Sequence, residues 1–254
     1  MQHRLGFALL VNPSEFIDAN LLWRGCHSPS ELALAVSLHR DGIFIDGGAY
    51  IGEFSLAMAA LSGSKVVAVE PSAGAATRLL RAIKLNELNA EVEVVRRPLW
   101  DVDGEQLALA SRSTRPDGLL SSGTRHVVPH HGQSSDRLTS VTVDSLVDPD
   151  EPVALIKLDL EGAEPRALVG AVQTIRRWSP FIILELHPAF GNSKLTLEFL
   201  AELGYEVFTI RKGARLEPVR DIDRWQNVLA RPPISKSLFR ALEERATLLC
   251  RSSL

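Results

Sequence analysis

Short apolar runs alternate with longer amphipathic stretches from residue 43 to residue 232. The short runs are typical of buried strands, and the stretches between them repeat apolar residues at helical spacing. Predicted strands cover residues 43–46, 65–70, 90–97, 153–159, 181–186, 205–211 and 227–232. Predicted helices cover residues 51–62, 73–88, 164–178 and 194–203. Because strands and helices alternate, the pattern predicts a doubly wound α/β domain with a mostly parallel sheet and right-handed crossovers.

An N-terminal helical cap over residues 1–42 is expected to precede this main domain, which spans residues 43–232. The cap contains a helix predicted over residues 28–39, with Ser30 as its candidate capping residue. Its residues at helical spacing are Leu32, Val36 and His39.

Two further segments depart from the alternation. Residues 101–144 form an insertion, and its irregular part from 111 to 137 predicts short extra strands or a functional lid, because long unstructured loops are unusual inside domains. Residues 233–254 predict a C-terminal helix that packs on the domain, although a dimerising helix, and hence a homodimer, stays open. The apolar face of that helix carries Leu238, Leu242, Ala246 and Leu249.

Composition and charge narrow the class of protein. Hydrophobic residues make up 45% of the 254 residues and charged residues 23%, which excludes disordered and fibrous classes. The net charge of -3 offers no overall positive field for nucleic acid or a membrane surface, so the expected partner is a small molecule. The apolar run over residues 5–11 is too short for a secretory signal, and no segment is long enough to span a membrane. We therefore expect a cytoplasmic protein whose two cysteines, Cys26 and Cys250, are buried or idle thiols, since their spacing suits neither a disulfide framework nor a metal-ligand pair.

A glycine-rich turn follows the first predicted strand, in the run FIDGGAYIGEFS over residues 44–55. Asp46 ends the strand, and Gly47, Gly48 and Gly52 allow positive φ angles and close approach of a ligand. The crevice beyond the carboxyl ends of the strands is where open parallel sheets bind ligands. The spacing is neither a strict GxGxxG nor a Walker A loop.

The charges around this turn favour one class of ligand. Asp46 and Glu53 flank the turn with no basic residue between them, and two like charges about 4 Å apart repel by about 4 kcal/mol at an effective dielectric constant of about 20. A pyrophosphate is thereby disfavoured, whereas S-adenosylmethionine carries an ammonium, a sulfonium and no phosphate. Glu70 ends the next predicted strand, where an acid can accept both ribose hydroxyls of an adenosine. Taken singly, Asp46 could instead cap a helix and Glu70 could be a solvated acid; their order along the chain favours the nucleoside site.

A second acidic cluster lies in IKLDLEGAE over residues 156–164. In a 3-2-1-4-5 strand order, Asp159 neighbours Asp46 at the topological switch point. If the bound ligand is S-adenosylmethionine, its methyl group is transferred to an acceptor molecule. We predict that Asp159 or His187 removes the proton from the acceptor hydroxyl, while Glu161 and Glu164 shape the pocket that holds the acceptor. The alternative is that these acids cap the helix that follows.

Metal binding is weighed but not predicted. Carboxylates are hard oxygen ligands, yet no second clear ligand can be placed beside the acidic cluster. The histidines of the insertion, His126, His130 and His131, could bind a metal or the acceptor, but an HxxxHH spacing in a loop has loose geometry, so a polar lid segment is the preferred interpretation.

Six motifs, in order over residues 40–210, resemble the FkbM family of methyltransferases. They are FIDGGAYIGEFS, VVAVEPS, RPLWDVDG, VTVDSL, IKLDLEGAE and IILELHP. The resemblance implies a class I methyltransferase Rossmann-like fold with seven strands in the order 3-2-1-4-5-7-6, strand 7 antiparallel, and methyl transfer from S-adenosylmethionine to oxygen. The chain departs from the family at Tyr50, where Asn is usual. Asn tolerates a left-handed backbone that Tyr resists, so either the local turn or its contact with the methionine moiety is expected to differ.

These observations combine into one interpretation with two rivals. The chain is expected to be an S-adenosylmethionine-dependent methyltransferase that acts on a hydroxyl of a small molecule or sugar. The rivals are a nicotinamide-dependent oxidoreductase on a Rossmann-like fold and a non-catalytic adenosine-ligand binding module. The cofactor residues are assigned as Asp46, Gly47, Gly48, Ala49, Tyr50, Gly52, Glu70, Pro71 and Asp159, and the catalytic residues as Asp159, Glu161 and His187.

Overall fold

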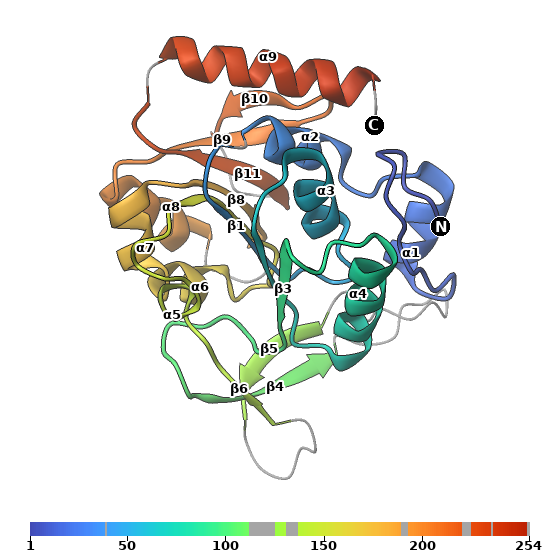
Figure 1. The fold of residues 1–254 in the computed structure, drawn as a ribbon. Helices are drawn as coiled ribbons and strands as arrows, with labels where there is room; N and C mark the ends of the chain where they lie inside the picture. The colour runs from blue at the N-terminus through green and yellow to red at the C-terminus, as the bar shows by residue number, and fades with distance from the viewer. Residues whose placement is uncertain are drawn as a thin grey trace.

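The centre of the molecule is a twisted sheet of eight strands, formed within the residues that the computed structural model describes (Figure 1). Those residues are 1–38, 40–111, 125–130, 137–188, 193–219, 225–234 and 236–252. The strands of this sheet are β1 (Ile43–Gly47), β2 (Val66–Val69), β3 (Val92–Val95), β7 (Val153–Leu158), β8 (Phe181–Leu186), β9 (Glu206–Arg211), β10 (Arg215–Pro218) and β11 (Gln226–Arg231).

The strand order across the sheet is β3-β2-β1-β7-β8-β11-β9-β10. Strand β11 is antiparallel to both of its neighbours, β8 and β9, whereas β1, β2, β3, β7 and β8 are parallel. With β10 left aside, the sheet has the 3-2-1-4-5-7-6 order of a class I methyltransferase. The expected count of seven strands is wrong, because β10 adds an eighth at the edge.

The extra strand β10 forms a hairpin with β9. Gly213 and Ala214 both have positive φ angles in the turn, as tight hairpins require. The sequence of β10, RLEP, is polar and mostly exposed. It therefore lacks the apolar alternation by which a strand is recognised in a sequence, and only pairing with β9 makes it a strand.

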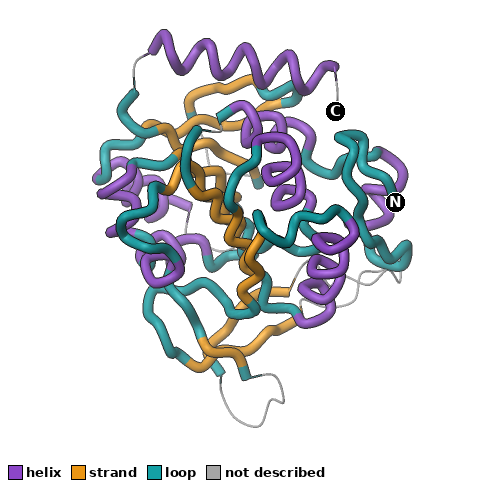
Figure 2. The backbone as a smooth tube through the Cα atoms, in the orientation of Figure 1, coloured by secondary structure: helices purple, strands orange, loops and turns teal. Residues whose placement is uncertain are grey.

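Helices cover both faces of the sheet, as Figure 2 shows by the strands that run between helical layers. One face carries α2 (Pro29–Ser37), α3 (Glu53–Ser62) and α4 (Ala73–Leu85). The other carries α5 (Val143–Leu146), α6 (Glu164–Val169), α7 (Val172–Trp178) and α8 (Ser193–Glu202). Alternation along β1 divides the core between these faces, since Phe44 packs in the first layer and Ile43 and Ile45 in the second.

The single helix predicted over residues 164–178 is instead two short helices, α6 and α7. The break comes at Gly170, where a Cβ atom would lie 2.1 Å from the carbonyl oxygen of Trp100. The chain thus needs glycine at this point to let the loop after β3 pass close to the helix. The spacing of apolar residues along the helix does not reveal such a contact between distant segments.

The N-terminal segment is built into the core rather than placed over it. It contains α1 (Phe16–Arg24) and α2, and residues 32–36 of α2 are buried in the same cluster as α3. The C-terminal helix, α9 (Lys236–Ser252), lies across the edge of the sheet and packs on α2 and β10 (Figure 1). His39 and the side chain of Leu238 lie outside the described residues. None of the helices described has both the length and the apolar character that crossing a bilayer demands.

The insertion forms a separate antiparallel sheet in the order β5-β4-β6. Its strands are β4 (Gln106–Ser111), β5 (Arg125–Pro129) and β6 (Leu138–Thr139). The prediction of short extra strands is thereby confirmed. His126 lies on β5 and His130 follows it, whereas His131 lies outside the described residues.

Candidate functional site

A pocket lies at the carboxyl ends of β1, β2 and β7, where the strand order reverses. Its empty volume, counting the space that is open to solvent, is about 590 Å³. Ile17 of α1 and Leu109 and Val127 of the insertion close it from outside. The other lining residues are Gly48, Tyr50, Glu70, Pro71, Ser72, Asp159, Leu160 and Glu161.

The glycine turn after β1 packs directly against the chain leaving β7. Gly48 has a φ of +75°, and a Cβ atom there would lie 2.0 Å from the carbonyl oxygen of Asp159. In addition, the backbone N–H of Asp159 donates to the carbonyl oxygen of Gly47 over 3.1 Å. These contacts hold the two loops together, so that both contribute to the same pocket.

Tyr50 adopts the left-handed conformation that its side chain disfavours, with a φ of +51°. Such a conformation costs an ordinary residue roughly 1–2 kcal/mol. Neighbouring contacts offset that cost, since the Tyr50 N–H donates to Glu70 Oε2 over 2.8 Å and the Arg78 guanidinium lies 5.1 Å from the centre of the Tyr50 ring. Arg78 is paired in turn with Asp18, a buried residue of α1. The turn therefore keeps the left-handed geometry despite the departure from Asn.

Glu70 presents a buried carboxylate to the pocket. Its oxygens accept hydrogen bonds from the backbone N–H groups of Tyr50 and Ser72, over 2.8 and 2.7 Å. Burial, together with the nearby Asp46, raises the pKa of Glu70 to about 7, although the two hydrogen bonds and Lys157 act to lower it. A carboxylate has more acceptor sites than two donors fill, so Glu70 can still accept ribose hydroxyls.

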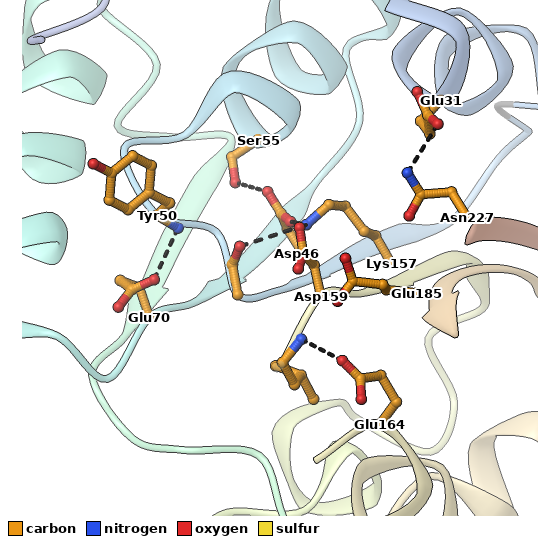
Figure 3. Close-up of polar contacts among 12 residues, drawn as sticks. Glu31, Asp46, Tyr50, Ser55, Glu70, Lys157, Asp159, Glu164, Glu185 and Asn227 are labelled. Carbon is orange, nitrogen blue, oxygen red and sulfur yellow. Dashed lines mark hydrogen bonds and ion pairs between the residues drawn. The ribbon is translucent and has the colours of Figure 1, made fainter. Parts of the chain in front are cut away.

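Asp46 supports the turn from beneath rather than lining the pocket. Ser55 donates to Asp46 Oδ2 over 2.6 Å, and Lys157 Nζ lies 3.4 Å from Asp46 Oδ1 (Figure 3). Lys157 Nζ also lies 3.7 Å from Asp159 Oδ2 and 3.4 Å from the carbonyl oxygen of Gly48. Burial alone would lower the pKa of Lys157, but Asp46 and Asp159 outweigh it and raise the pKa. The buried ammonium group of Lys157 therefore compensates the negative charge of Asp46.

Glu53 points away from the pocket, contrary to its expected place beside the ligand. It accepts hydrogen bonds from His3 Nε2 over 3.1 Å and from the His27 N–H over 2.8 Å. His3, Cys26 and Glu53 form a buried group whose candidate ligand atoms lie within 4.8 Å of one another. Burial and Glu53 raise the pKa of the Cys26 thiol, which therefore stays protonated. Glu53 is therefore not one of the residues that line the pocket, although it was expected to flank the ligand and disfavour a phosphate there.

The acidic cluster after β7 separates into two roles. Asp159 is half exposed and lines the pocket, together with Glu161, whose φ is +55°. Glu164 is buried and accepts hydrogen bonds from the N–H groups of Leu160 and Gly162, over 2.7 and 3.0 Å. Burial raises the pKa of Glu164 to about 7. Glu164 closes the loop that presents Asp159 and Glu161, and does not itself line the pocket.

The predicted site residues fall into two groups. Those on the pocket are Gly48, Tyr50, Glu70, Pro71, Asp159 and Glu161. Those outside its lining are Asp46, Gly47, Ala49, Gly52 and His187. The first four of the second group shape the turn, and His187 follows β8 at the same edge of the sheet.

Sequence reasoning missed several residues that shape the site. Ser55, Arg78 and Asp18 hold the turn, and no motif marks them. The sequence motifs do not assign Lys157 to the site, although alternation along the strand places it on the same face as Asp159. Glu185 of β8 was not considered, yet Figure 3 shows it beside Lys157 and Asp159.

The charged residues that line the pocket are acidic. Glu70 is a buried carboxylate on one side, and Asp159 and Glu161 lie on the chain that follows β7. None of the described residues that line the pocket is basic. A phosphate would therefore find no charged partner here, whereas an ammonium or sulfonium would.

Comparisons with known proteins agree with this geometry. The family model described as the methyltransferase FkbM domain matches residues 46–207. An FkbM methyltransferase from Methylobacillus flagellatus has 18% identity and a TM-score of 0.49, covering 84% of this chain and 53% of its own. The human methyltransferase 10 domain containing protein has 13% identity and a TM-score of 0.51, covering 91% and 90%. No curated protein matches the sequence.

The chain thus spans about half the length of the Methylobacillus flagellatus protein, and its similarity to the human protein supports the fold alone. The family model is more specific, because it matches more than half of this chain and includes both acidic loops of the pocket. Together with the strand order, this match shows that the chain belongs to the FkbM family of S-adenosylmethionine-dependent methyltransferases.

Proposed function

We propose that this chain binds S-adenosylmethionine in the pocket and methylates a hydroxyl oxygen of an uncharged small molecule or sugar. The observation that carries the proposal is that Glu70 and Asp159 line one pocket from neighbouring loops. One carboxylate suits a ribose and the other lies where an acceptor can approach. The bound cofactor would supply an electrophilic methyl group on its sulfonium.

Different residues of the pocket would bind different parts of the cofactor. Glu70 accepts the ribose hydroxyls, with Pro71 and Tyr50 beside it, while Gly48 leaves room for the methionine part. Asp159 and Glu161 make the field favourable for the ammonium and sulfonium. Lys157 is buried and forms ion pairs with both Asp46 and Asp159. These ion pairs hold the acidic loop after β7 in place, and the cation that makes them is not exposed.

The acceptor half of the site requires a positioned base. Asp159 is half exposed, lies on the pocket and is the candidate for removing the hydroxyl proton. Its interaction with Lys157 orients the carboxylate. His187 remains the second candidate, since it follows β8 at the same edge, one strand away from Asp159.

Calorimetry separates this proposal from the oxidoreductase alternative. We expect S-adenosylhomocysteine to bind to the purified chain with a dissociation constant in the micromolar range, and NAD to give no heat of binding at the same concentrations. The reason is that the described pocket lining holds acids and no base to meet a pyrophosphate. Tight binding of NAD with no binding of S-adenosylhomocysteine would reverse the assignment.

Transfer of a labelled methyl group tests the remaining alternative, a binding module without activity. Incubation with labelled S-adenosylmethionine and a panel of hydroxyl compounds is expected to yield a methylated product. Binding of the cofactor without transfer to any member of the panel would favour the non-catalytic module.

The pH dependence of cofactor affinity follows from Glu70. Its pKa of about 7 lies above the ordinary value because burial disfavours the charge. Ribose hydroxyls donate more strongly to the carboxylate than to the neutral acid, so binding below pH 7 releases a proton. The affinity for S-adenosylhomocysteine should therefore rise with pH, by up to about tenfold per unit below the pKa, and level off above it.

Titration calorimetry from about pH 5.5 to 8.5 measures this slope. The Glu70→Gln variant should bind about 10- to 100-fold more weakly, because it loses one or two charge-assisted hydrogen bonds, and should lose the slope. Glu93→Gln is the matched control, since Glu93 is an exposed acid on the neighbouring strand β3. An unchanged slope in Glu70→Gln would assign the titration to another group, such as Glu164.

A further inference from the structure

An exposed tryptophan lies at the edge of the sheet that carries the pocket. Trp225 immediately precedes β11 and is 55% exposed. Its indole Nε1–H donates to Glu185 Oε1 near the end of β8. This hydrogen bond fixes one edge of the ring while more than half of the residue stays accessible. A large apolar ring held in place at the surface is a feature that binding sites use.

Strand pairing places Trp225 at the same edge of the sheet as Asp159. Gln226 pairs with Leu186 and Asn227 with Glu185, so Trp225 lies beyond the carboxyl end of β8. Strand β8 separates β11 from β7, the strand that ends at Asp159. Neighbouring strands are about 4.8 Å apart, which puts the backbones of β11 and β7 about 10 Å from each other at this edge. A single six-membered ring fits across that distance.

Carboxylates gather at the carboxyl ends of β7 and β8, at the edge of the sheet where β11 begins. Figure 3 shows Glu185 next to Asp159 and Lys157, and Glu185 is close enough to Lys157 and Glu164 to influence the pKa of both. Asp159 and Glu161 lie on the pocket wall. Acids of this kind accept hydrogen bonds from hydroxyl groups and repel anions.

We infer that Trp225 and Glu185 form the acceptor subsite, and that the acceptor is an uncharged, polyhydroxylated ring such as a pyranose. The inference deepens the proposed function and rests on it. The C–H face of the ring packs on the indole, and its hydroxyls donate to Glu185, Glu161 and Asp159. The hydroxyl nearest Asp159 would give its proton to the Asp159 carboxylate while its oxygen takes the methyl group from the sulfonium, so that the S–CH3 bond breaks and S-adenosylhomocysteine leaves. Glu185 acts here both as a ligand for the acceptor and as the group that orients Trp225.

Binding of glycosides tests this subsite without requiring turnover. Saturation-transfer difference NMR is recorded for the methyl α-glycopyranosides of glucose, galactose and mannose, with S-adenosylhomocysteine present. At least one glycoside is expected to receive saturation at its ring C–H protons. Trp225→Ala should weaken that binding at least tenfold, whereas Trp225→Phe, which keeps an aromatic face, should retain most of it. Glu185→Gln should weaken it as well.

Trp23 provides the matched control, because it is an exposed tryptophan, 89% accessible, on α1 rather than at this edge. Trp23→Ala should leave glycoside binding unchanged. Equal binding by wild type and Trp225→Ala would overturn the inference, as would saturation of none of the glycosides. If S-adenosylhomocysteine binds in calorimetry while the glycosides do not, the subsite assignment fails and the proposed function stands. If S-adenosylhomocysteine does not bind, the proposed function fails too.

Discussion

Replacing Asp159 by Asn is expected to lower the rate of methyl transfer by about 10²- to 10⁴-fold, the range that a positioned general base contributes. Asn keeps the shape of the side chain but cannot accept the hydroxyl proton. The affinity for S-adenosylhomocysteine should change by less than about tenfold, because Glu70 and the glycine turn are intact. The fold should hold, since Lys157 keeps its contact with Asp46. Single-turnover transfer of a labelled methyl group measures the rate.

The matched control for this variant is Asp150→Asn, because the Asp150 side chain is 88% exposed and remote from the pocket lining. Its rate should equal that of wild type. If Asp159→Asn also retains the full rate, Asp159 is not the base, and His187→Gln becomes the variant to measure. A raised KM with unchanged kcat would place Asp159 in acceptor binding alone.

Replacing Gly48 by Ala is expected to destabilise the protein and to weaken cofactor binding at least 100-fold. The added Cβ atom would lie 2.0 Å from the Asp159 carbonyl oxygen, and the φ of +75° is unfavourable for any side chain. The left-handed backbone costs roughly 1–2 kcal/mol. The clash costs about 1–3 kcal/mol more, because the backbone of the neighbouring loop must move. Chemical denaturation measures the free energy of unfolding, and calorimetry measures the affinity for S-adenosylhomocysteine.

Gly104→Ala separates the cost of the left-handed backbone from the cost of the clash. Gly104 has a φ of +84°, but a Cβ atom there would meet nothing within 4 Å. This variant should lose only the backbone part, about 1–2 kcal/mol, and should bind the cofactor normally. If Gly48→Ala loses no more stability or affinity than Gly104→Ala, then close packing between the loops after β1 and β7 does not form the pocket. The assignment of the glycine turn to the cofactor site would then be wrong.

Local pattern was sufficient to predict the central sheet. Strands such as β1 and β7 are mostly apolar and buried along their whole length, as is typical of parallel strands covered on both faces. The break at Gly170 and the extra strand β10 could not be predicted, because each depends on a partner elsewhere in the chain. For Gly170 that partner is the carbonyl group of Trp100, and for β10 it is strand β9.

In the candidate site, too, some features follow from local sequence and others depend on partners that are distant in the chain. The sequence by itself determined that acids lie at or just beyond the carboxyl ends of β1, β2 and β7, and parallel strands bring these ends to one edge. It did not determine which acids face the ligand. Glu53 turns away because His3, from the far N-terminus, donates to it, and Asp46 is neutralised by Lys157. Only the tertiary structure decided these points, since the charge state and direction of a buried acid depend on partners that are distant in the chain.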